Sequence, residues 1–135
     1  MHKMIRTLMI AGLSMPLFAA AQSGNVTLPQ DKGPDKVNVS SYPVEQQKGY
    51  KVFTDKCSKC HTIARPINTS MSAPEWSRYV KRMMHKPNSG ISDAQGKTIY
   101  EFLAYDQETR KDKNPSAFSK ALSDEEIEKL KAQQH

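Results

Sequence analysis

The feature that most constrains this chain is the run Cys57-Ser58-Lys59-Cys60-His61, which holds both cysteines of the 135-residue sequence. On a helix, residues three and four positions apart lie on one face, so both sulfur atoms and the imidazole can point at a single object. Two thiols in this arrangement can bond to the two vinyl groups of a porphyrin while the imidazole binds its iron. Cys-x-x-Cys-His is the attachment pattern of c-type haem, and we therefore predict one covalently attached haem c at Cys57, Cys60 and His61.

Other uses of a Cys-x-x-Cys pair fit the sequence less well. A thioredoxin-like redox disulfide is expected beside a βαβ pattern, and none is visible around these cysteines. A structural zinc ion needs four ligands, and neither His85 nor His135 has finger-like spacing from a second cysteine pair. A plain disulfide would give no reason for a histidine directly after Cys60.

Residues 1–21 have the features of a secretory signal peptide. Lys3 and Arg6 make a basic start, residues 8–20 form an apolar run, and residues 19–21 are three alanines that fit the cleavage rule. The apolar run is shorter than a membrane span requires. We therefore expect export to the periplasm without stable membrane insertion, and an uncleaved anchor is the alternative.

The remaining chain divides into three predicted segments. Residues 22–44 are rich in polar residues, proline and glycine without a clear period, so we expect a flexible lead-in that is extended or disordered. Residues 45–106 carry the helical patterns and form the predicted haem domain. Residues 107–135 are polar and charged, which predicts a solvated C-terminal extension with one short helix after Ser123.

Helix signals within the haem domain predict an all-α fold. Helices are expected at about residues 45–59, 73–85 and 93–105, the second and third each preceded by a serine that opens a capping box. Gly49 lies inside the first helix, which suggests a close approach by another helix. A domain of about sixty residues buries too little surface to be comfortably stable alone, so the haem is expected to complete the core.

The second axial ligand of the iron is the open question in the sequence. On a helical wheel with Trp76 at zero, Val80 falls at about +40° and Met83 at about −20°, while His85 falls at about 180° on the charged face. Met83 is therefore the favoured ligand. Met84, Met71 and His85 follow as alternatives, as do ordinary core packing of the methionine and an open five-coordinate iron that would bind gases or peroxide.

These residues together resemble a class I c-type cytochrome over roughly residues 45–106. The resemblance lies in the helix with Gly49, the Cys-x-x-Cys-His motif, Pro66, and the Trp76-to-Met83 pattern W-x-x-x-V-x-x-M. More narrowly, it extends to small monohaem cytochromes, including haem subunits that accept electrons from periplasmic dehydrogenases. It implies a helical fold around one haem, with the Pro66 carbonyl orienting the proximal imidazole and the Trp76 indole packed on the haem or against a propionate.

The function that the resemblance implies is the transfer of single electrons between periplasmic redox partners, without enzymatic chemistry of its own. A haem subunit of a dehydrogenase complex and a five-coordinate ligand-binding protein are the alternatives. Ten basic residues against five acidic ones between positions 46 and 106 favour partners with acidic docking surfaces. A basic surface that serves solubility alone is equally compatible. Export and the lack of a binding motif argue against nucleic acid.

Overall fold

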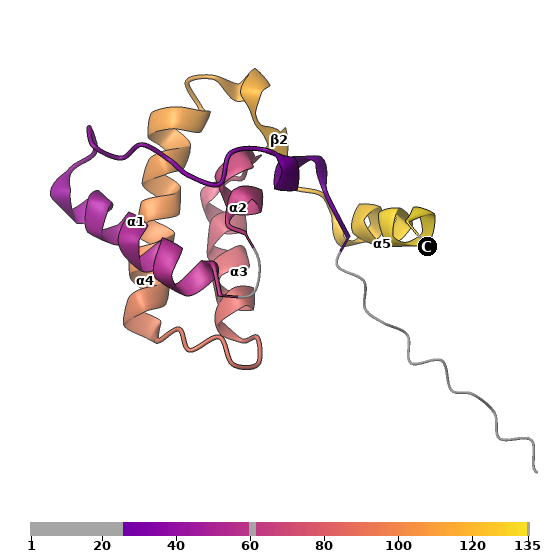
Figure 1. The fold of residues 1–135 in the computed structure, drawn as a ribbon, viewed down its shortest axis with the longest axis horizontal. Helices are drawn as coiled ribbons and strands as arrows, with labels where there is room; N and C mark the ends of the chain where they lie inside the picture. The colour runs from indigo at the N-terminus through magenta and orange to yellow at the C-terminus, as the bar shows by residue number, and fades with distance from the viewer. Residues whose placement is uncertain (1–25, 60–61, 135) are drawn as a thin grey trace, which may run out of the picture.

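The computed structural model describes residues 26–59 and 62–134, so the predicted signal peptide, Cys60 and His61 lie outside the described residues. Five α-helices make up most of the fold: α1 (Val44–Cys57), α2 (Ala64–Asn68), α3 (Ala73–Met84), α4 (Asp93–Asp106) and α5 (Asp124–Gln133). The two-residue strands β1 (Thr69–Ser70) and β2 (Ser119–Lys120) pair in parallel. The predicted all-α class is confirmed (Figure 1). No helix in the described part of the chain is long and apolar enough to span a membrane.

Serine caps begin three of the helices, as the sequence predicted. The backbone N–H of Ser72 donates to the carboxylate of Glu75 over 2.7 Å at the start of α3. Ser123 makes the same contact with Glu126 over 2.7 Å at the start of α5. Each box satisfies amide groups that a helix start leaves without partners, so these boundaries are set by local sequence.

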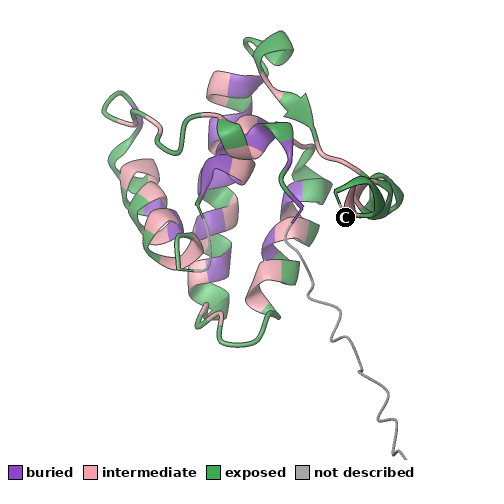
Figure 2. Cartoon of the chain, turned by 45° about the vertical axis from the view of Figure 1, so that its right-hand side comes forward, coloured by how far each residue is buried: buried purple, intermediate pink, exposed green. Residues whose placement is uncertain are grey.

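The core lies where α1 and α3 each pack against α4. The rings of Phe53 and Phe102 are both buried, with centroids 5.5 Å apart, and buried positions line the facing sides of these helices (Figure 2). A Cβ on Gly49 would stand 3.0 Å from the Cβ of Phe102, tighter than most real contacts of this kind. The glycine therefore permits the close approach of α1 and α4 that the sequence suggested.

The lead-in was expected to be extended or disordered. It is largely extended, and it packs against the rest of the protein. Val26 and Leu28 are buried, and a short 3-10 helix (Pro29–Lys32) packs on α2. Asn68 of α2 donates to the carbonyl of Pro34 over 2.9 Å. Isolated apolar residues that each fill a separate gap leave no period in the sequence, which is why these contacts were not expected.

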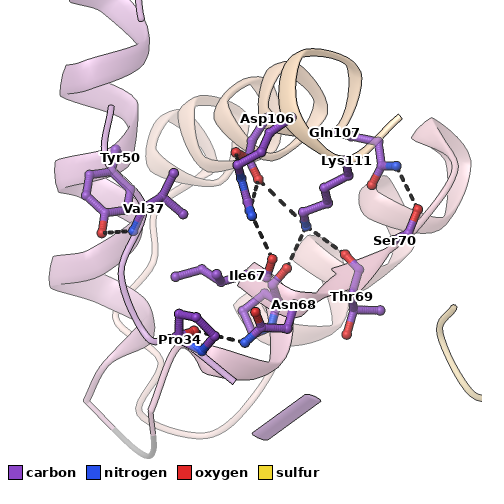
Figure 3. A network of polar contacts seen from close by, with 12 residues as sticks. Pro34, Val37, Tyr50, Ile67, Asn68, Thr69, Ser70, Asp106, Gln107 and Lys111 are labelled. Atoms are coloured by element: carbon purple, nitrogen blue, oxygen red, sulfur yellow. Dashed lines mark hydrogen bonds and ion pairs between the residues drawn. The ribbon is translucent and has the colours of Figure 1, made fainter. Parts of the chain in front are cut away.

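The chain continues directly from α4 into a π-helical turn (Gln107–Lys111) that is also part of the core. Lys111 is fully buried, and its ammonium donates to the carbonyls of Pro66 over 2.8 Å and Thr69 over 2.6 Å (Figure 3). Its Nζ also lies 3.7 Å from the carboxylate of Asp106. Burial lowers the pKa of Lys111 to about 7, and the charge of Asp106 opposes that shift.

The segment after residue 106 thus differs from the solvated extension that its composition predicted. Arg110 donates to the carbonyl of Ile67 over 3.0 Å, and β2 pairs with β1 next to α2. Two charged residues of this segment, Arg110 and Lys111, are paired with carbonyls and with Asp106. The exposed, polar part begins later, and α5 contains no fully buried residue.

Candidate functional site

A cavity of about 180 Å³ opens where α1 ends, beside α2 and the last turn of α3. We call it the Cys57 cavity. Cys57 is the last residue of α1 and lies in the wall of this cavity. Apolar side chains make much of the remaining wall: Ile63, Pro66, Tyr79, Met83, Pro87 and Ile91. The described cysteine, Pro66 and Met83 of the predicted site are therefore brought together around one space.

The thiol of Cys57 is half-buried, and burial raises its pKa to about 11. Cysteines that work in disulfide exchange have lowered pKa values, because the thiolate is the reactive species. Burial of Cys57 has the opposite effect on its pKa. This environment suits a cysteine whose sulfur is held in an apolar wall.

A second cavity of about 340 Å³ adjoins the first, since Tyr79, Met83 and Lys86 line both. We call it the Ile127 cavity. Its other walls come from the lead-in, from α2 and the residues after it, from α3 and from the C-terminal segment, including Leu28, Gln30, Arg65, Met71, Arg82, Leu122, Ile127 and Lys131. Burial raises the pKa of Tyr79 to about 12, so its hydroxyl stays neutral between these cations at ordinary pH.

One polar atom in the wall of the Ile127 cavity has no partner. The side-chain oxygen of Gln30 is buried and makes no hydrogen bond within the described part of the chain, although its Nε2 donates to the carbonyl of Lys120 over 3.3 Å. Buried polar atoms are normally satisfied, so this oxygen is an exception among the buried side-chain atoms of the described residues.

The four candidate iron ligands lie in different surroundings. Met83 lies in the walls of both cavities. Met84 packs on α4, where a Cβ on Gly96 would collide with its sulfur. Met71 lines the Ile127 cavity, and His85 is exposed with its Nδ1 2.6 Å from the carbonyl of Lys81. Of these four residues, Met83 is the one in the wall of the Cys57 cavity.

Trp76 is not among the residues that line the Cys57 cavity. Its indole is fully buried, and Nε1 donates to the side-chain oxygen of Gln107 over 3.2 Å. The ammonium of Lys111 lies 4.6 Å from the centre of the ring. The helical wheel placed Trp76 and Met83 on one face, but they are two turns apart, and the earlier turn packs on the segment after α4. Trp76 therefore packs on the side of α3 that faces the π-helical turn after α4.

Several residues of the site carried no usable signal in the sequence. Gln30 and Arg65 reach the Ile127 cavity from segments without periodicity, and Ile91 lies in the loop before α4. Tyr79 shared the wheel face of Met83, so its position in both cavities could have been inferred from the helical period.

The described residues suit a mostly apolar group. The wall of the Cys57 cavity supplies a thiol at a helix end, a thioether and several apolar side chains, with lysines among its other lining residues. The fold and the cavity together define a small helical protein with an apolar space large enough for part of a bound group.

A comparison with known families identifies that group. The family model described as Cytochrome c matches residues 46–132, more than half of the chain. The protein therefore belongs to the cytochrome c family, and it is a haem-binding electron-transfer protein that carries covalently attached haem c with its iron. The match runs well past residue 106, in agreement with the packing of the π-helical turn. Neither the curated proteins nor the solved structures contain a match to the chain.

Proposed function

We propose that this cytochrome carries single electrons between periplasmic redox partners, with His61 and Met83 as the axial ligands of its iron. The observation that carries the proposal is the position of Met83 in the wall of the Cys57 cavity. Met84, the nearest rival in the sequence, is packed against Gly96 instead. Residues 1–21 would direct the chain to the periplasm as a signal peptide.

When bound, haem supplies an iron that cycles between Fe(II) and Fe(III) with small changes in its surroundings. The Met83 thioether favours the reduced iron, which raises the potential. The apolar walls of the Cys57 cavity keep water away from the site. Electron transfer needs no substrate pocket, so a pocket filled by the prosthetic group is compatible with this function.

The role of Pro66 can also be stated in terms of its neighbours. Pro66 is buried, lies in the wall of the Cys57 cavity, and its carbonyl accepts a hydrogen bond from Lys111 over 2.8 Å. A carbonyl oxygen has two lone pairs, so this bond leaves one available for the imidazole of His61. We propose that Lys111 holds the Pro66 carbonyl in position for that second bond.

Partner docking is proposed at the basic rim of the Cys57 cavity, where Lys56, Lys59 and Lys86 lie. The amine of Lys56 donates to the carbonyl of Gly90 over 2.9 Å, while Lys59 and Lys86 are exposed. Positive groups around an opening attract acidic partners and speed transient association. This arrangement supports redox partners with acidic docking surfaces.

The test of the ligand assignment is the absorption spectrum of the oxidised holoprotein. Ligation by a methionine sulfur gives a weak charge-transfer band at the red end of the spectrum. We expect the band in the wild type, its loss in Met83→Ala and its retention in Met84→Ala. Met84→Ala is the matched control because it removes the same side chain one position along, where the sulfur faces α4.

Two results would contradict the proposal. Loss of the band in Met84→Ala with retention in Met83→Ala would transfer the ligand role to Met84. A high-spin wild-type spectrum with immediate binding of carbon monoxide would instead indicate an open iron and a ligand-binding function.

A further inference from the structure

The two ends of the described chain meet at the Ile127 cavity. Leu28 and Gln30 enter its wall from the N-terminal side, and Leu122, Ile127 and Lys131 from the C-terminal side. Figure 1 shows α5 beside the beginning of the described chain, away from α1 and α4. We call residues 26–32 together with residues 122–134 the clasp.

Hydrogen bonds join the two halves of the clasp. The side chain of Gln134 accepts from the backbone N–H of Thr27 over 3.2 Å and donates to the carbonyl of Thr27 over 3.1 Å. Gln30 of the N-terminal half also donates to the carbonyl of Lys120, just before the C-terminal half begins, over 3.3 Å. The bonds to Thr27 are exposed to solvent, so they hold the ends together weakly and reversibly.

The two halves differ in how firmly they are attached to the rest of the protein. The N-terminal half is anchored by Arg65, whose Nε donates to Asp31 over 2.7 Å and whose Nη2 donates to the carbonyl of Val26 over 2.7 Å. The α5 half has no buried residue, and its ion pairs, such as Lys129 with Glu125, lie within the helix. Segments with few buried contacts open at low free-energy cost, so α5 is the half that is expected to open first.

The closed clasp lies next to the proposed iron ligand. Met83 lies in the wall of the Ile127 cavity together with Ile127 and Leu122 of the clasp. An external ligand can reach the iron only after the Met83 sulfur has left it, and the displaced side chain then needs space in the cavity. With α5 in place, Leu122 and Ile127 form part of the wall of that cavity, so the clasp bounds the space open to the displaced side chain.

We propose that the clasp closes the cavity beside Met83 and thereby controls how fast external ligands replace this methionine. The inference rests on the proposed function, since it takes Met83 as the axial ligand. Ile127 and Gln134 act as access-determining residues without touching the iron. Opening of α5 would expose the Met83 side of the site, and closing would keep the protein an electron carrier.

The experiment compares carbon monoxide binding to reduced holoproteins by stopped flow. One variant ends at Leu122 and lacks α5, and a second carries Ile127→Ala with Gln134→Ala in the full chain. Glu125→Ala with Lys129→Ala is the matched control, because it removes an exposed ion pair of α5 that does not line the cavity. The methionine band of each oxidised protein is recorded beforehand.

We expect both clasp variants to bind carbon monoxide about tenfold faster than the wild type, with the methionine band retained and the control unchanged. Should the truncated chain fail to fold, the double substitution decides the question alone. Wild-type rates in the double variant, or equal acceleration in the control, would overturn the clasp while leaving the electron carrier intact. A wild type without the methionine band would overturn the proposed function and the clasp with it.

Discussion

The hydrogen bond between Tyr42 and Asp106 offers the sharpest test of how the lead-in is joined to the haem domain. The Tyr42 hydroxyl donates to the Asp106 carboxylate over 2.8 Å, and the two residues are 8% and 1% exposed. Burial and this carboxylate raise the pKa of Tyr42, so the hydroxyl keeps its proton at all ordinary pH values. The bond therefore connects a neutral donor to a buried anion.

The expected loss of stability in Tyr42→Phe depends on the hydrogen bonds that the Asp106 carboxylate retains. A hydrogen bond to a charged group contributes about 1.5–3 kcal/mol. Asp106 is not left unpaired, because Arg110 donates to both of its oxygens over 2.8 and 2.7 Å. We therefore expect a loss of about 2 kcal/mol in the free energy of unfolding, which lowers the melting temperature by about 8 °C or more in a domain of this size.

The assay is urea unfolding of the holoproteins followed by far-ultraviolet circular dichroism. Tyr105→Phe is the matched control: its ring packs edge-on against Tyr42 with centroids 5.1 Å apart, and within the described residues its hydroxyl is assigned no hydrogen bond. The control should change the free energy of unfolding by less than about 0.5 kcal/mol. Equal losses in the two variants would refute the assigned role of the buried hydrogen bond.

Two further predictions concern buried positions of the fold. Burial lowers the pKa of Lys111 to about 7 from its ordinary 10.5, so between these values the unfolded chain binds more protons and stability rises with pH. In urea unfolding at several pH values, the free energy of unfolding of the wild type should rise by at most about 1.4 kcal/mol per pH unit, and that of Lys111→Met should lack this rise. Equal pH dependence in the two proteins would contradict the prediction. Gly49→Val should lower the free energy of unfolding by about 1–3 kcal/mol in the same assay, because the valine Cβ would stand 3.0 Å from the Cβ of Phe102. Lys48→Val measures the propensity effect of valine at an exposed neighbour, and an equal cost there would remove the steric explanation.

The cytochrome c assignment and the helical class could be predicted from local sequence. Capping boxes fix the starts of α3, α4 and α5 because the bonding groups lie within one turn of each other. The haem-attachment motif needs residues only three and four positions apart, so it too is visible without a structure. Gly49 could be interpreted because glycine lowers the stability of a helix, and a close contact with another helix explains its presence there.

The extent of the domain could not be predicted in the same way. Lys111 looked like a solvated residue because composition carries no information on distant partners. Its acceptors, Pro66 and Thr69, lie more than forty positions earlier in the chain. A charged residue is buried only where such partners converge, and that convergence is a property of the folded chain.

The candidate methionine ligands also show what the sequence can indicate and what only the tertiary structure decides. The sequence alone favoured the end of one helix for the second ligand, because the helical period places Met83 and Met84 on or near its apolar face, and it kept Met71 and His85 as alternatives. Tertiary structure separated them, with Met84 against Gly96 of α4 and Met83 in the wall shared by two cavities. Periodicity gives the direction of a side chain from its own helix axis, whereas the neighbour it meets depends on how the helices cross. The sequence by itself determined the haem, and the packing of α3 against α4 decided which methionine of α3 lines the Cys57 cavity.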